Sequence, residues 1–367
     1  MAEASVGEVL ERPKEIRNFT GEASLVLPHD FIGIEIELEG LTKIPELPSF
    51  SYWALHADNS LRTEGGENPL QAIEFVLKFP LCGKDLVNSL KEFHSTVGAM
   101  KKPPITSERT SVHIHLDVRD LSIRELYRLI IIYCVFEKVL FRYCGIDRED
   151  NNFCVPFYRA EGHIFENISE IQRKGLRQFT KYLESEYRYA ALNLCALLKF
   201  GSVEFRHCGG TYDVESIKNW INIIFKLKQY AKNTTFSLQT FPSHISDLGY
   251  LPIIEEVFGE YAPLLVKIES KQDLLIGIRQ AQKILCAATS QEVEQRLNKE
   301  LWGEQTVEDS PLIKKYLQKK GIYQEKKKND NKQNNNATYS VEYSEIMEAA
   351  VAQSAWVTST TSPSRRT

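Results

Sequence analysis

The sequence predicts an α+β fold in which a mostly antiparallel sheet carries its core on one face. Four short stretches alternate between apolar and charged residues, which is the period of a strand with one buried face. Between and after them, apolar residues recur at the three- and four-residue spacing of amphipathic helices. At 367 residues the chain exceeds one average domain, so appendages to a single large domain are expected.

The composition restricts the class of protein. Hydrophobic residues make up 43% and charged residues 26%, as in ordinary soluble globular proteins. The formal net charge of −4 argues against general binding of a nucleic-acid backbone. The sequence contains no apolar run long enough for a membrane span, and its start lacks a secretory pattern. The seven cysteines form no C-x-x-C pair, which favours reduced thiols in a cytoplasmic protein over a zinc finger.

The chain divides into four segments by pattern and composition. Residues 1–25 are polar and unpatterned, and we expect a flexible lead-in. Residues 26–235 form the domain with every candidate functional residue, and residues 236–323 a helical extension packed on it. Residues 324–367 begin with a low-complexity linker and are expected to be mostly disordered. This tail contains one candidate docking segment, anchored by Trp356.

The first alternating stretch, F-I-G-I-E-I-E-L-E at residues 31–39, places glutamates on one face. Successive side chains of a strand point to opposite faces, so Glu35 and Glu37 project together, about 7 Å apart. Two like charges at that spacing repel each other. For an isolated acidic pair, a solvated edge strand is the more common explanation. Recurrence of the same alternation in three later stretches favours a different one.

Three later strands share this design, with charged or imidazole side chains on one face. They span residues 72–79, 111–118 and 202–206. A shorter strand within residues 52–61 runs into a turn at Asp58-Asn59-Ser60, and residues 207–211 are expected to form a turn. Helices are expected where apolar residues recur at helical spacing: residues 84–97, 122–143, 213–231, 252–258, 271–287, 291–302 and 310–320.

Each charged face has an ordinary explanation when it is taken alone. A lone H-x-H is more often two satisfied histidines than a metal site, and a lone E-x-R is usually a surface ion pair. An antiparallel sheet with a one-sided core brings these faces side by side, where so many carboxylates are costly without a cation. The combined set comprises Glu35, Glu37, Glu74, His113, His115, Glu204 and Arg206.

The ligand types in this set indicate the chemistry. Carboxylate oxygens with one imidazole suit Mg²⁺ or Mn²⁺ better than zinc. Arg206 among the acids indicates an anionic ligand, because guanidinium binds phosphate and carboxylate in a bidentate manner. Hard metal ions together with an arginine suggest a nucleoside triphosphate.

The order of the motifs resembles the amidoligase family, which belongs to the carboxylate–amine ligase superfamily of glutamine synthetase and glutamate–cysteine ligase. The motifs are G-I-E-I-E, W-A-L-H-A-D-N-S-L, I-E-F-V, S-V-H-I-H-L, R-Y-A-A-L-N-L and V-E-F-R-H-C-G-G-T, over about residues 30–230. The resemblance implies a curved, mostly antiparallel sheet of glutamine-synthetase-like type, with helices on its convex face. It also implies an ATP-dependent ligase that joins a carboxylate to an amine through an acyl phosphate.

The resemblance assigns roles to individual residues. Two divalent ions would be held by Glu35 and Glu37, one ion each. His113 and Glu204 would join Glu35 at the ion that bridges the ATP phosphates, and Glu74 would join Glu37 nearer to the substrates. The implied catalytic residues are Arg206, Glu74 and Glu204. The implied ATP contacts are His115, Arg206 and Ser60, and the implied substrate contacts are Asp58, Arg188 and Asn193.

One departure from the family pattern leaves alternatives open. After Glu74 the run V-L-K-F-P replaces the usual small-residue and proline turn, so Lys78 would neutralise a metal position or contact a phosphate. A non-catalytic protein that retains the ligase fold and a metal-dependent hydrolase are the two alternatives. Cysteine catalysis at Cys208 beside His207 ranks below both. The substrates remain open among small molecules, peptides and protein side chains.

Overall fold

The computed structural model describes the sheet, its covering helices and part of the helical extension. The described residues are 4–10, 15–17, 23–25, 31–41, 51–62, 71–100, 102–160, 189–234, 237, 240–267, 270–284, 315, 318 and 319. No helix in this part of the chain is long and apolar enough to cross a membrane. The predicted helices at 291–302 and 310–320, the linker, the tail and Arg188 lie wholly or mostly outside the described residues.

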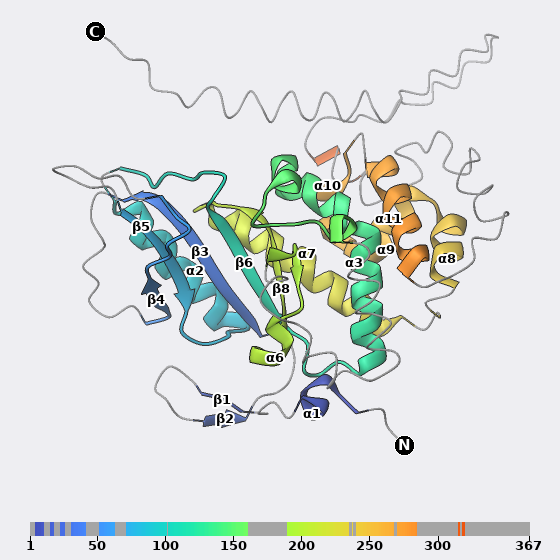
Figure 1. Ribbon diagram of the computed structural model, residues 1–367, viewed down its shortest axis with the longest axis horizontal. Helices are drawn as coiled ribbons and strands as arrows, with labels where there is room; N and C mark the ends of the chain where they lie inside the picture. Colours follow the sequence, from blue (N-terminus) through green and yellow to red (C-terminus); the bar gives the residue numbers. More distant parts are fainter. Residues whose placement is uncertain are drawn as a thin grey trace, which may run out of the picture.

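A six-stranded antiparallel sheet forms the centre of the structure, and it is not closed into a barrel (Figure 1). The strand order is β4-β5-β3-β6-β8-β7. The strands are β3 (Ile32–Leu41), β4 (Trp53–His56), β5 (Gln71–Leu77), β6 (Ser111–Asp117), β7 (Leu192–Asn193) and β8 (Ser202–Gly209). The mixed fold and the antiparallel sheet are confirmed, while the glutamine-synthetase-like type stays a prediction. The strand with the acidic pair is central, so it is not a solvated edge.

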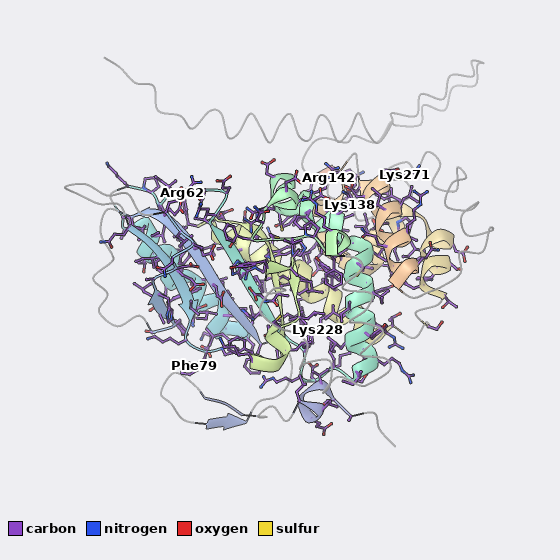
Figure 2. The ribbon with its side chains drawn as sticks, in the orientation of Figure 1. Arg62, Phe79, Lys138, Arg142, Lys228 and Lys271 are labelled. Carbon is purple, nitrogen blue, oxygen red and sulfur yellow. The ribbon has the colours of Figure 1, made fainter. Side chains whose placement is uncertain are left out.

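The apolar face of the sheet packs against three helices, α2 (Gly83–Gly98), α3 (Ile123–Cys144) and α7 (Val214–Asn233). Aromatic rings join each helix to the strands. Phe93 of α2 lies 5.2 Å from Phe75 of β5, and Trp220 of α7 lies 6.2 Å from Phe205 of β8, between ring centroids. Side chains fill the space between these layers (Figure 2). This core faces away from the charged side chains, as the alternation predicts.

The sequence signals at the helix termini are confirmed. Ser122 and Glu125 form the capping box of α3, and Gly145 follows its last residue with a φ of 112°. Asp213 accepts from the backbone N–H groups of Glu215 and Ser216 at the start of α7. Short 3-10 turns follow α3 as η1 (Ile146–Asp150) and η2 (Phe157–Ala160), and α6 (Ala196–Phe200) precedes β8.

Helices of the extension pack beside α3. They are α8 (Phe241–Leu248), α9 (Tyr250–Phe258), α10 (Ala262–Leu265) and α11 (Ser270–Ile284), with the 3-10 turn η5 (Gly259–Tyr261). α11 crosses α3 closely, because a Cβ atom at Gly277 would lie 1.9 Å from the carbonyl oxygen of Val135. The Nε of Arg142 donates to Asp273 at 2.6 Å across the same contact. The predicted helix at 252–258 is confirmed, and the one at 271–287 is confirmed as far as Ile284, the last described residue of α11.

The N-terminal residues contain short elements that the sequence does not predict. Helix α1 (Val6–Val9) has a capping box from Ser5 and Glu8, and its Val6 N–H donates to Leu121 O at 2.8 Å. Strands β1 (Glu15–Arg17) and β2 (Ala23–Leu25) pair antiparallel. The bond to Leu121 and a second one, from the Gly7 N–H to Arg119 O at 3.0 Å, dock α1 on the loop that precedes α3.

The prediction of a turn at residues 207–211 is wrong, because β8 continues to Gly209. The pairing of β8 with β6 shifts in register, so that Arg206 and His207 together lie opposite His113. This is a β-bulge, which inserts one extra residue without ending the strand. His207 therefore points into the core, where its ring centroid lies 4.6 Å from that of Phe141 and 5.6 Å from that of Trp220.

Candidate functional site

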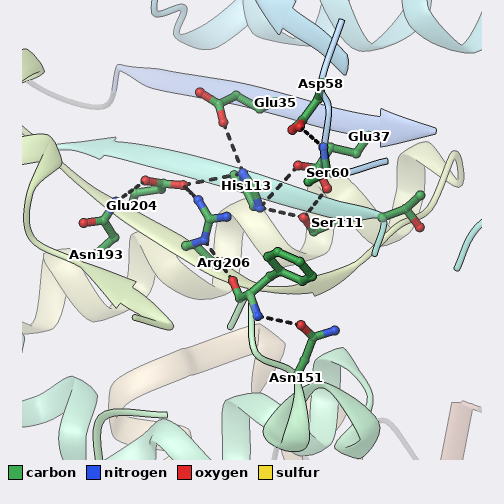
Figure 3. A network of polar contacts seen from close by, with 12 residues as sticks. Glu35, Glu37, Asp58, Ser60, Ser111, His113, Asn151, Asn193, Glu204 and Arg206 are labelled. Atoms are coloured by element: carbon green, nitrogen blue, oxygen red, sulfur yellow. Dashed lines mark hydrogen bonds and ion pairs between the residues drawn. The ribbon is translucent and has the colours of Figure 1, made fainter. Parts of the chain in front are cut away.

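The charged face of the sheet gathers the predicted residues from four adjacent strands. Figure 3 shows Glu35 and Glu37 of β3, His113 of β6, and Glu204 and Arg206 of β8. The strand pairing places Glu37 directly opposite Glu74, Glu35 opposite His113, and His115 opposite Glu204. Like charges directly opposite each other destabilise a sheet, and the two glutamates are in that arrangement. The prediction that these side chains meet on one face is confirmed by the register.

His113 lies at the centre of the cluster and is almost completely buried. Its Nε2 lies 2.6 Å from the Ser111 hydroxyl, which donates to Glu37 Oε2, also at 2.6 Å. A hydroxyl has one proton, so this arrangement assigns the Nε2–H of His113 as donor to Ser111. The Nδ1 lone pair then faces Glu35 Oε2 at 3.1 Å and Glu204 Oε1 at 3.5 Å. A lone pair facing two carboxylates is the arrangement of a metal ligand held by a second hydrogen bond.

His115 lies between Glu35 and Ser202 and contacts both side chains. Its Nε2 lies 3.3 Å from Glu35 Oε1, and its Nδ1 lies 3.2 Å from the Ser202 hydroxyl. Burial lowers the pKa of His115, but the hydrogen bond with Glu35 and the charge of Glu204 raise it above the ordinary value. Burial alone would raise the pKa of Glu35, yet the neighbouring imidazoles of His113 and His115 hold it well below its usual range.

Glu204 is held from two sides. Asn193 on β7 donates its side-chain amide to Glu204 Oε2 at 2.6 Å, and Arg206 Nη1 donates to Glu204 Oε1 at 2.5 Å. Burial would raise the pKa of Glu204, but the charges of Arg206 and His115 lower it below its ordinary value. The guanidinium of Arg206 also donates through Nε to Phe153 O at 3.2 Å. Asn193, predicted to contact substrate, is buried here and orients Glu204.

The other end of the cluster is acidic. Glu37 and Glu74 meet Asp58, which lies in the turn after β4, and one oxygen of each lies within 4.8 Å of the others. Asp58 is oriented by the Ser60 backbone N–H, which donates to its Oδ1 at 2.7 Å. Burial, followed by the charges of Glu35 and Glu37, raises the pKa of Glu74 to about 8.

Among the residues that the structure describes, three overlapping groups of side chains could hold a metal ion. In each group the candidate ligand atoms all lie within 4.8 Å of one another. The groups are Glu35–Glu74–His113, Glu35–His115–Glu204 and Glu37–Asp58–Glu74. Together the three groups offer five carboxylates and two imidazoles, a donor set that fits a hard divalent ion. Burial and then the charges of Glu35 and Glu37 raise the pKa of Glu74, and a cation at this place would relieve the repulsion between these carboxylates.

A cavity of about 220 Å³ opens beside Glu35 and His115. Its walls are partly aromatic and apolar, with contributions from Phe31, Pro80 and Phe200. Lys78 and Arg119 also line it, so positive charge lies beside the acidic cluster. Lys78 thus lies at the cavity with Glu35 rather than among Glu37, Asp58 and Glu74.

A comparison with known protein families matches the segment of the chain that forms most of this sheet. Residues 46–227 match the family described as "Putative amidoligase enzyme". The resemblance predicted from the motif order is confirmed for this segment, and the description of the amidoligase family indicates a ligase. The match includes β5, β6 and β8 but begins after Glu35 and Glu37, which the structure places in the same cluster. No curated protein matches the chain.

The sequence did not predict a role in the site for two side chains, Ser111 and Asp117. Ser111 shares the face of His113 at a spacing of two residues, but a serine alone carried no signal beside two histidines. Asp117 lies on the same face and pairs with Arg119 at 2.6 Å, next to the cavity. Ser60 was expected beside the nucleotide, and the structure places it with Asp58, at the end away from the cavity.

The pairing of Cys208 with His207 for cysteine catalysis has no support in the structure. The Nε2 of His207 lies 2.9 Å from the Tyr133 hydroxyl, deep in the core behind the sheet. Burial, with a smaller contribution from Arg148, lowers the pKa of His207 to about 3. Such an imidazole cannot act as a base for a thiol near neutral pH.

Proposed function

We propose that the protein is an ATP-dependent carboxylate–amine ligase that uses Mg²⁺ or Mn²⁺. ATP would transfer its γ-phosphoryl group to a substrate carboxylate, and an amine would then displace phosphate to give an amide, ADP and phosphate. The observation that carries the proposal is the double cluster of metal-type ligands, with Arg206 beside it and a cavity at one end. The amidoligase match over residues 46–227 supports the class of reaction.

The geometry favours a division of the cluster into two ion sites. Glu35, His113 and Glu204 would hold the ion nearer to the cavity, since Nδ1 of His113 faces both carboxylates. Glu37, Asp58 and Glu74 would hold the second. Divalent ions there would neutralise charge on the triphosphate and on the substrate carboxylate. Asp58 is an addition to the predicted ligands, since the motif order implied only a substrate contact.

The protein's own residues would position and stabilise charge. Arg206 would stabilise the phosphoryl group during transfer, because its guanidinium is fixed by Glu204 and Phe153 O. The aromatic and apolar walls of the cavity suit a nucleoside, and His115 on its wall would lie beside the phosphates. The triphosphate would then point from the cavity toward the acidic end, where the carboxylate and the amine would meet.

The test measures ADP release from purified protein with Mg²⁺, ATP and pools of amino acids and peptides. We expect release that depends on an added carboxylate and an added amine, and that Glu35→Gln and Arg206→Gln abolish. Glu260→Gln is the matched control, because Glu260 lies on η5, is exposed and forms an ion pair with Lys226 of α7. ADP release that no acid or amine alters would contradict the proposal. ATP-independent cleavage of an ester, amide or phosphodiester would instead establish the metal-dependent hydrolase.

A further inference from the structure

Arg148 in η1 is a buried arginine whose partners are backbone carbonyl groups. Its Nε donates to His207 O at 3.3 Å, its Nη2 to Arg206 O at 3.1 Å and its Nη1 to Glu108 O at 3.2 Å. Only 6% of its surface is exposed. Within the described ranges no carboxylate forms an ion pair with it. A buried guanidinium normally pairs with an acid, so its use on three carbonyls requires an explanation.

Two of these carbonyls belong to the bulge of β8. Opposite His113 the strand inserts one extra residue, so that Arg206 and His207 occupy the place of one. A bulge disrupts the local ladder, and a buried carbonyl group needs a donor from elsewhere. The planar fork of an arginine donates in several directions at once and serves adjacent carbonyls from a single side chain. Arg148 therefore stabilises the bulge.

Arg148 also holds the backbone from which the Arg206 side chain leaves the strand, because its Nη2 donates to the carbonyl oxygen of Arg206 itself. The Arg206 side chain reaches Glu204, as Figure 3 shows, and Phe153 O. The next residue, His207, enters the core. Alternation from Phe205 directs Arg206 to the charged face, and the extra residue displaces only the residues that follow it. The orientation of the Arg206 guanidinium thus depends on the backbone that Arg148 holds.

We propose that Arg148 is a positioning residue for Arg206, and this inference rests on the proposed function of the site. Arg148 acts through the backbone and contacts no carboxylate of the cluster. Its third bond is not essential to that role, because the Asn151 side chain also donates to Glu108 O, at 2.5 Å. Loss of the guanidinium therefore leaves the loop at Glu108 anchored and releases the bulge.

The first experiment measures binding of Mg²⁺ with the non-hydrolysable ATP analogue AMPPNP by calorimetry. Arg148→Gln is expected to weaken binding about tenfold or more, which is about 1.4 kcal/mol, because the backbone of Arg206 loses its charged donor. Arg148→Lys keeps the charge but not the planar fork of donors, so its affinity should lie between those of the wild type and Arg148→Gln. In an Arg206→Gln background, Arg148→Gln should cause no further loss. An equal and additive loss in that background would overturn the proposal.

The matched control is Arg142→Gln, which removes a part-buried arginine at the contact between α3 and α11, away from the sheet (Figure 2). It should lower stability while leaving the affinity for the analogue within about twofold. If Arg142→Gln weakens binding as much as Arg148→Gln, the effect of Arg148 is a general loss of stability.

The second experiment does not require ATP binding, so it separates this inference from the proposed function. NMR of the Arg206 Nε–H group reports its bond to Phe153 O. We expect its hydrogen exchange to become about tenfold faster or more in Arg148→Gln and in Arg148→Lys, and to stay unchanged in Arg142→Gln. If the wild-type protein fails to bind the analogue, the proposed function fails while this measurement still tests Arg148. Unchanged exchange in both Arg148 variants would overturn the positioning role.

Discussion

The two faces of the central sheet differ in nearly every physical respect, although the same strands form both. On one face Ile36 pairs with Phe75, and both are completely buried. On the other face their neighbours Glu37 and Glu74 pair as like charges. Burial of each apolar side chain contributes about 1.5–3 kcal/mol, whereas opposed charges destabilise the pair. The apolar face thus stabilises a charged face that would not form by itself.

Two histidines near the bulge show the same difference. His113 and His207 are both buried, but His113 is surrounded by carboxylates and a serine hydroxyl. His207 packs against aromatic rings and bonds only to Tyr133 through Nε2, while its Nδ1 has no partner. Tyr133 donates its own proton to Glu137 at 2.7 Å, so Nε2 of His207 carries the proton of a neutral ring. Identical residues therefore serve chemistry on one face and packing on the other.

The largest expected effect tests the apolar face. Phe75→Ala should lower the free energy of unfolding by about 3–5 kcal/mol, because it leaves a cavity among Trp53, Phe93 and the strands. Urea unfolding measures the change. The control is Phe200→Ala, since Phe200 lies at the cavity of the charged face and is half exposed. It should cost about 1 kcal/mol or less. Equal losses would show that the two faces contribute alike to stability.

The second effect is the dependence of stability on pH through His207. Its pKa is about 3 in the folded protein, because of burial, and about 6.5 in an unfolded chain. The unfolded state binds the proton more readily in this window, so stability falls as pH falls from 6.5 toward 3. The loss should reach about 2–3 kcal/mol between pH 6.5 and 4.5.

His207→Phe checks the cause of this dependence. It should flatten this part of the stability profile in urea unfolding at several pH values. His94→Gln is the control, because His94 is exposed on α2 and should leave the slope unchanged. A slope that survives in His207→Phe would assign the titration to another group.

The difference between the faces also explains what the sequence predicts. Strict alternation around Glu35 and Glu37 predicts both the core side and the charged side, because a strand has no other way to place its side chains. The bulge at Arg206 was not predicted, since register depends on the partner strand and not on β8 alone. The sequence predicted Asp58 as a substrate contact but not its place beside Glu37 and Glu74, because its turn reaches them only through tertiary packing. Motif order predicted the cluster but not Ser111, whose hydroxyl lies between His113 and Glu37 and holds both.

A third prediction removes the charge of Glu74. Its pKa of about 8 lies above the ordinary value because of burial and nearby acids, so without metal, stability falls as pH rises from 4.5 to 8. Glu74→Gln should remove this fall and stabilise the metal-free protein at pH 8 by on the order of 1 kcal/mol. Added Mn²⁺ should stabilise the wild type more than the variant. Thermal unfolding in EDTA and in Mn²⁺ measures both effects, and a variant less stable than the wild type in EDTA would contradict the repulsion.

The smallest effect separates charge from burial on the charged face. Glu108 is an acid on a neighbouring loop, where it pairs with Arg62 at 2.6 Å, but the two side chains are 73% and 56% exposed. Solvent screens such a pair, so Glu108→Gln should change the free energy of unfolding by about 0.5 kcal/mol or less. It is the same chemical change as Glu74→Gln in a different environment. If urea unfolding in EDTA shows equal effects for both variants, neither burial nor the opposed glutamates account for the behaviour of Glu74. If only Glu74→Gln stabilises, the cost of the charged face lies in the buried pair across β3 and β5, where a cation would relieve it.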